Sequence, residues 1–106
     1  MGHFMYGGQS FEFEDRVLAH IKTAIEVRLR KHESFLLSWN VAPQFGSGRV
    51  SLWMAPTMPL IFMFSGSRPP VLNRDWIAVM TEHAHTVRGM IIVSEAEAMA
   101  YSRSRK

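Results

Sequence analysis

The segment DRVLAHIKTAIEVRLRK, residues 15–31, carries the clearest helical pattern in the chain. At about 100° per residue its apolar side chains fall in one sector, and oppositely charged residues four positions apart lie on the other side. Asp15 supplies the acidic residue that favours a helix N-terminus. The pattern predicts an amphipathic helix over residues 15–31, with an apolar face formed by Val17, Leu18, Ile21, Ala24, Ile25 and Leu29.

Two residues of this predicted helix need a separate interpretation. His20 lies beside the apolar sector rather than within it, and no nucleophile or oriented acid is recognisable near it. We therefore expect His20 at the surface or on the flank of the helix, and not as a general base. Arg28 lies within the sector, so we expect its stem to cover apolar surface while its guanidinium meets a helix C-terminus or an acid such as Glu33.

Three segments after the helix alternate between apolar and other residues, which is typical of half-buried strands. They are residues 34–41, 49–55 and 60–65, separated by a loop at 43–48 and a turn at 56–59. Connections this short favour an antiparallel meander. The residues predicted to face the core are Phe35, Leu37, Trp39, Val50, Leu52, Met54, Phe62 and Phe64.

Turn and capping residues predict the remaining elements. A Gly-Gly pair at residues 7–8 separates two short alternating segments, as in a tight β-hairpin. Asn73 is placed to cap a second helix over residues 74–88 that ends at Gly89, and a last strand follows at residues 90–93. The sequence thus predicts an α+β fold of order β-β-α-β-β-β-α-β, with a single mostly antiparallel sheet and two helices packed on one face.

The length and composition predict one small domain. The chain has 106 residues, of which 47% are hydrophobic, so it can bury a core without metal or disulfide support. We expect a single domain over residues 1–95 and a basic, flexible tail over residues 96–106. Cysteine is absent, no signal peptide is visible and the apolar runs are too short to cross a bilayer, so we expect a cytoplasmic protein without membrane contact.

The formal net charge of +3 is concentrated at the end of the chain. Arg103, Arg105 and Lys106 lie in the predicted tail against a single acid, Glu97, whereas the body is close to neutral. A short basic tail is only weak evidence that a protein binds nucleic acid. A solvated chain end is the simpler interpretation.

Two loops, at residues 46–49 and 65–68, each end in an arginine after a run of small residues. The second loop leads to Asn73 and Arg74 at the predicted helix start, where backbone N–H groups favour anions. An anion site is one interpretation, and turns selected for their backbone angles are the other. No Gly-x4-Gly-Lys-Ser/Thr motif is present, so we expect no nucleotide cofactor.

The second face of the predicted sheet is too apolar for a face in water. Leu36, Trp53, Ile61 and Met63 would lie on it, whereas an antiparallel sheet usually exposes a polar face. A contiguous apolar patch marks a partner surface, which is the interpretation we favour. With Arg49 beside Trp53, a platform for stacked bases is the second interpretation. The third interpretation is that the N-terminal hairpin or the tail covers this face.

Metal and catalytic sites are not predicted. His83 and His85 are two positions apart on the predicted second helix, so their rings project about 200° apart and cannot share an ion. The other histidines lack ligand spacing, and the sequence has no paired carboxylates or activated nucleophile. We therefore expect no metal, no cofactor, no small-molecule substrate and no enzymatic activity.

Four segments cover most of the chain: DRVLAHIKTAIEVRLRKHESFLLSW (15–39), GSGRVSLWMAP (46–56), PLIFMFSGSRPPVLNRDWI (59–77) and GMIIVSE (89–95). Together they resemble a family of small actinobacterial domains of unknown function, many of whose members carry the label ATP-dependent DNA ligase. The resemblance extends over roughly residues 4–95. The chain departs from it at His32, where glycine is common in the family and would end the first helix more sharply.

The ligase label implies an activity that this sequence does not support. An ATP-dependent DNA ligase needs a nucleophilic lysine in a Lys-x-Asp-Gly context and a nucleotidyltransferase domain well over this length. Lys22, Lys31 and Lys106 are not followed by x-Asp-Gly. From the resemblance we therefore expect no ligase activity and, at most, an association with nucleic acid.

These patterns predict a non-catalytic interaction module that self-associates, as a homo-oligomer, or binds a protein partner through the apolar sheet face. The alternative is a small nucleic-acid-associated protein that binds the phosphate backbone through its arginine-bearing loops and basic tail. The contacts in that alternative would be Arg49, Arg68, Asn73, Arg74, Arg103, Arg105 and Lys106.

Overall fold

Three helices and two three-stranded sheets form the part of the chain that the structure, a computed structural model, describes: residues 1–41, 46, 48–84 and 86–104. The α+β class predicted from the sequence is confirmed. In chain order the elements are β1 (Gly2–Tyr6), β2 (Gln9–Phe13), α1 (Asp15–Leu29), β3 (Phe35–Val41), β4 (Gly48–Met54), β5 (Leu60–Met63), α2 (Arg74–Glu82), β6 (Met90–Ile91) and α3 (Glu95–Ser104).

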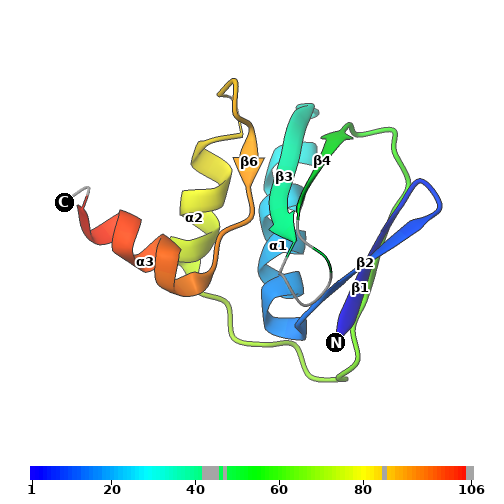
Figure 1. Ribbon diagram of the computed structural model, residues 1–106, viewed down its shortest axis with the longest axis horizontal. Coiled ribbons are helices and arrows are strands. Elements are labelled where there is room, and N and C mark those ends of the chain that lie inside the picture. Colours follow the sequence, from blue (N-terminus) through cyan, green and yellow to red (C-terminus); the bar gives the residue numbers. More distant parts are fainter. Residues whose placement is uncertain (42–45, 47, 85, 105–106) are drawn as a thin grey trace.

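The strands form two sheets rather than the single sheet that we expected. The hairpin sheet has the order β2-β1-β5, and the central sheet has the order β4-β3-β6, in which β6 runs parallel to β3. The segment between β4 and β5 therefore carries the chain from one sheet to the other. Figure 1 shows α2 and α3 at one end of the molecule and the β1–β2 hairpin at the other, with the central sheet and α1 between them.

The β1–β2 hairpin forms as predicted. Gly7 and Gly8 have φ angles of 55° and 84°, a region that favours glycine. On the inner face of the hairpin sheet, Phe4 stacks on Phe62 of β5 at 5.1 Å between ring centroids. The inner face also reaches the central sheet, where Trp39 meets the edges of two hairpin phenylalanines. Both sheets thus contribute to one core.

Helix α1 ends in a Schellman motif centred on His32. The N–H of Glu33 donates to the carbonyl of Arg28, and the N–H of His32 donates to the carbonyl of Leu29. His32 has a φ of 60°, in the left-handed region where glycine is the usual residue. The departure from the family pattern at this position therefore falls on a strained backbone site.

Helix α2 is shorter than the sequence pattern predicted. Asn73 caps it as expected, because its side chain accepts from the N–H groups of Asp75 and Trp76. The helix ends at Glu82 instead of continuing to Arg88, and single turns follow. Val87, which lies within the helix predicted over residues 74–88, is 100% exposed because it lies in those turns.

The segment expected to be a flexible tail begins as helix α3. Ser94 and Glu97 form a reciprocal capping box, with N···O distances of 2.9 and 3.1 Å. Ala98 is fully buried in the core, where α3 packs on α2. Arg105 and Lys106 lie outside the described residues, as do His85 and most of the loop predicted at 43–48. None of the helices in the described ranges is long and apolar enough to cross a membrane.

Candidate functional site

Within the described residues, one polar group connects α1, α2 and α3, and we call it the polar network: Arg16, His20, Asn73 and Glu95. Arg16 of α1 makes a bidentate contact with Glu95 of α3, with N···O distances of 2.7 and 3.2 Å. Its remaining terminal nitrogen donates to the carbonyl of Val71 at 2.7 Å. The amide of Asn73 donates to the same Glu95 carboxylate at 2.8 Å.

His20 lies at the centre of the polar network and is fully buried, so its expected position on the helix flank is wrong. Its Nε2 accepts from the backbone N–H of Asn73 at 2.7 Å. Because a backbone N–H can only donate, the ring proton must be on Nδ1, which lies 2.7 Å from the carbonyl oxygen of Arg16. Both ring nitrogens are therefore used in one tautomer of the neutral imidazole.

The two charged side chains of the polar network, Arg16 and Glu95, pair with each other. The hydrogen bonds from Arg16, and then from Asn73, lower the pKa of Glu95 to about 2. The same contact with Glu95 raises the pKa of Arg16. The two side chains remain partly exposed, so solvent weakens the pair. The carboxylate is thus held as an acceptor for Arg16 and Asn73 and is not poised to take up a proton near neutral pH.

This arrangement supports a structural role for the polar network rather than chemistry. Each nitrogen of His20 already has a backbone partner, and the donors of Arg16 point to Glu95 and Val71. Across residues 1–41, 46, 48–84 and 86–104 no group of three or more potential ligands could hold a metal ion. The polar network fixes how α1, α2 and α3 pack against one another.

Sequence reasoning missed the pairing of Arg16 with Glu95. The two residues are far apart in the chain, and neither has a local pattern that names its partner. Arg28, by contrast, behaves as expected. Its guanidinium donates twice to the carbonyl of Thr81 near the end of α2, at 2.7 and 3.1 Å, and contacts Glu33 at 3.4 Å.

The backbone groups predicted to bind an external anion are occupied by the chain itself. The N–H groups of Ser65 and Gly66 donate to the carboxylate of Asp15, at 3.2 and 2.8 Å. These two bonds, led by the one from Gly66, lower the pKa of Asp15. At the start of α2 the side chain of Asn73 takes the free N–H groups. The loop therefore binds the carboxylate of Asp15, a group of the same chain, rather than an external anion.

The arginines of the nucleic-acid alternative come from four different parts of the fold. Arg49 lies on β4, Arg68 in the loop after β5, Arg74 at the start of α2 and Arg103 near the end of α3, and all four are exposed. The other two cations of that set, at positions 105 and 106, lie outside the described residues. No strand or helix gathers these arginines into one row.

The predicted apolar face is divided between the two sheets. Leu36 and Trp53 are cross-strand partners in the central sheet, where Trp53 is 59% exposed. Ile61 and Met63 lie on β5 in the hairpin sheet, and they are 53% and 52% exposed. The structure therefore replaces one predicted patch with two, linked by a hydrogen bond from the Tyr6 hydroxyl to the carbonyl of Trp53.

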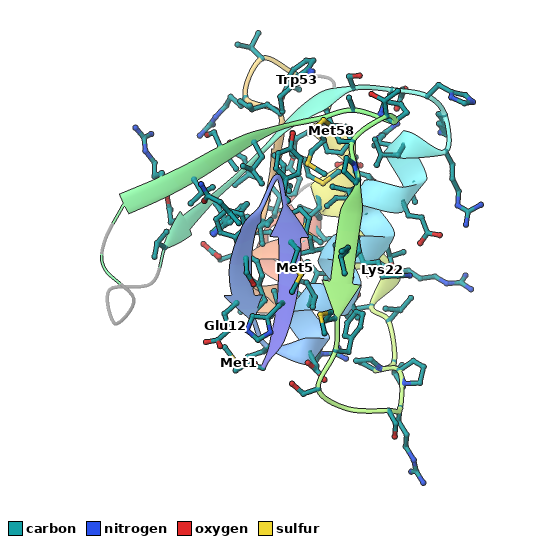
Figure 2. All side chains as sticks on the ribbon, turned by 90° about the vertical axis from the view of Figure 1, so that its right-hand side faces the viewer. Met1, Met5, Glu12, Lys22, Trp53 and Met58 are labelled. Carbon is teal, nitrogen blue, oxygen red and sulfur yellow. The ribbon has the colours of Figure 1, made fainter. Side chains whose placement is uncertain are left out.

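One of these patches lies on the outer face of the hairpin sheet, and we call it the methionine face: Met5, Ile61 and Met63. Met5 is directly opposite Ile61 across the β1–β5 pair, and His3 is opposite Met63. The alternate residues Phe4 and Phe62 point to the core, so the three apolar side chains share the outer side. Figure 2 views this sheet from outside, with Met5 in the middle of it.

The fold and these surfaces define a small α+β domain whose three helices are connected by the polar network and whose strands expose apolar side chains. The chain belongs to the family described as Domain of unknown function (DUF7882), whose model matches residues 1–95. The matched region ends at Glu95, the first residue of α3. Searches of curated proteins and of solved structures gave no significant match.

Proposed function

We propose that this chain is a non-catalytic interaction module that binds a protein surface, either a second copy of itself or another protein, through the methionine face. One observation carries the proposal: Ile61 and Met63 are each more than half exposed on a sheet whose opposite face is buried in the core. A solvated sheet face is normally polar. Apolar side chains gathered on such a face are typical of interaction sites.

The chemistry of the methionine face suits a protein partner. Methionine side chains are flexible and polarisable, so they adapt to an apolar surface without a fixed shape. At the rim, His3 lies 3.5 Å from Glu12, which places two polar groups beside the apolar centre. An apolar centre with a polar rim is the usual anatomy of a protein interface. In a two-fold pair, the same face of both copies would be buried.

The solution mass of the purified chain tests this proposal, measured by light scattering at low and high salt. The proposal expects a mass above the monomer mass of 12.1 kDa at both salts, because apolar contacts are not screened. Met63→Asp should return the mass to that of the monomer. Trp53→Asp is the matched control, since Trp53 is also more than half exposed but lies on the central sheet.

Three results would change the conclusion. Dissociation by Trp53→Asp but not by Met63→Asp would move the interface to the central sheet. A monomer under all conditions would rule out self-association and leave a different protein as the partner. A mass gain only with added DNA or RNA, and only at low salt, would favour the alternative in which Arg49, Arg68 and Arg74 contact phosphates.

A further inference from the structure

A shallow groove runs along α1 beside β5 and the loop after it, and we call it the α1–β5 groove. One half has a volume of about 310 Å³ and the other about 290 Å³, near the lower end of the ~300–1,000 Å³ range of ligand sites. Lys22 lines both halves, so the two hollows adjoin at this side chain. The apolar lining comes from Ala19, Ile25, Leu29, Leu60, Phe62, Phe64 and Leu72.

The length of the α1–β5 groove matches a short extended chain. Its α1 wall runs from Ala19 to Arg30, which is about 16 Å at the helical rise of ~1.5 Å per residue. An extended strand of about five residues has the same length at ~3.3 Å per residue. Figure 2 shows Lys22 beside β5, on the side away from the strand that carries Met5.

The strand beside the α1–β5 groove has one unpaired edge. β5 pairs with β1 on one side, and within residues 1–41, 46, 48–84 and 86–104 no strand pairs with its other side. That edge presents backbone N–H and C=O groups that can extend a sheet. Leu60 and Phe62 line the groove, whereas Ile61 and Met63 belong to the methionine face. One strand therefore serves two surfaces with alternate residues.

The rim of the α1–β5 groove carries more positive than negative charge. On α1, Glu26 contacts both Lys22, at 3.5 Å, and Arg30, at 2.6 Å, so one carboxylate is shared by two cations. The hydrogen bond from Arg30 is the largest cause of the lowered pKa of Glu26, so this acid stays ionised. Arg68 adds a third cation in the other half. Carboxylates of a partner would complement this rim.

We propose that the α1–β5 groove binds an extended acidic peptide segment with apolar residues at alternate positions, which pairs as an added strand with the β5 edge. The apolar side chains of the peptide contact Leu60 and Phe62 across from α1. Its backbone completes the hydrogen bonds of the β5 edge. Its carboxylates lie on the other side of the added strand and are attracted by Lys22 and Arg30 at the rim over a distance within the screening length of about 10 Å. This binding uses a surface separate from the methionine face.

The test uses two-dimensional amide NMR of the ¹⁵N-labelled chain, titrated with the blocked heptapeptide Glu-Val-Glu-Val-Glu-Val-Glu. The amide signals of residues 60–63 and 22–30 should shift, and those of α3 should not. A peptide of the same composition in blocks, Val-Val-Val-Glu-Glu-Glu-Glu, has the same charge without the alternation. It should bind more weakly, since only an alternating strand presents all its apolar side chains to one side.

A charge-swapped variant tests the role of the rim. Lys22→Glu/Glu26→Lys/Arg30→Glu keeps two i,i+4 ion pairs on α1 but reverses the net charge of these three side chains, so that the rim, which still has Arg68, becomes neutral. It should bind the glutamate peptide about tenfold more weakly or worse. Met5→Ser alters the methionine face outside the groove, so it should leave peptide binding unchanged even where it reduces self-association.

The proposal is overturned by three results. The first is no shift with either peptide, which would make β5 a short, protected edge. The second is equal affinity of the wild-type chain and the charge-swapped variant for the glutamate peptide. The third is a shift of the 22–30 amides with protein concentration alone, because these residues line the groove and not the methionine face, so it would identify a second copy as the occupant of the groove.

Discussion

The imidazole of His20 stacks on the indole of Trp76, with 4.2 Å between the ring centroids and 24° between the ring planes. Both rings are buried, and the contact joins α1 to the first turn of α2. The indole N–H donates to the carbonyl of Val93 at 2.9 Å, just before α3. One aromatic pair therefore holds the three helices together where the polar network surrounds them.

His20→Ala should lower the free energy of unfolding by about 2–4 kcal/mol, because it leaves a cavity beside Trp76 and removes the acceptor of the Asn73 N–H. Urea denaturation followed by tryptophan fluorescence measures this change. His3→Ala is the control, since His3 is partly exposed and its ring lies 3.5 Å from the carboxylate of Glu12 across the hairpin. Equal losses in the two variants would contradict the central role of His20.

The stability of the chain should fall at acid pH through Glu95. The pKa of Glu95 in the folded chain is about 2, below its ordinary value of 4.5, so its contribution is present above pH 4.5 and is lost as the pH falls toward 2. The lowered pKa of Asp15 acts in the same direction. Denaturation midpoints over this range should decline less steeply for Glu95→Gln, and identical slopes would contradict the prediction.

His32→Gly should stabilise the chain by about 0.5–1 kcal/mol, because glycine adopts the left-handed backbone of the Schellman motif without steric cost. Thermal denaturation measures the change. Lys31→Gly is the matched control one position earlier. Lys31 is not in that backbone region, so this substitution should destabilise the chain. A stabilising Lys31→Gly would show that the effect is not specific to position 32.

Gly89→Ala should destabilise the chain more than Gly8→Ala, although both positions have positive φ angles, 74° and 84°. A Cβ at position 89 would lie 2.4 Å from the carbonyl oxygen of Leu36, whereas one at position 8 meets nothing within 4 Å. We expect losses of about 3 kcal/mol or more against about 1 kcal/mol. Comparable losses in chemical denaturation would show that the turn before β6 relaxes around the added methyl group.

The sequence predicted those features that depend on neighbouring residues. The period of α1, the glycines of the hairpin and the cap at Asn73 each act within one turn or strand, so local patterns reveal them. The alternation over residues 60–65 correctly predicts that Phe62 packs against the core, but its prediction for Phe64 is wrong, since that side chain is 36% exposed. The alternation also does not show which strand lies beside β5. Its pairing with β1 depends on the contact between Phe4 and Phe62, which no local pattern encodes.

The polar network could not be predicted for the same reason. Helical periodicity gives the angle of His20 around α1, whereas its burial depends on Asn73 and Trp76 from another element. We predicted a flexible tail instead of helix α3 because the sequence of this segment is only weakly apolar. Its small Ala98 is the residue that packs into the core, and small residues add little to a hydrophobic pattern.

The region shared with the family ends at Glu95, the residue that forms the ion pair with Arg16. The hydrophobic core continues beyond this position to Ala98. A recombinant fragment trimmed to residues 1–95 would replace the first turn of α3 with a charged chain terminus. It would also uncover the surface of α2 on which α3 packs. The smallest portion that can be excised, fused or exchanged between relatives as an intact piece is therefore longer than the segment defined by sequence similarity.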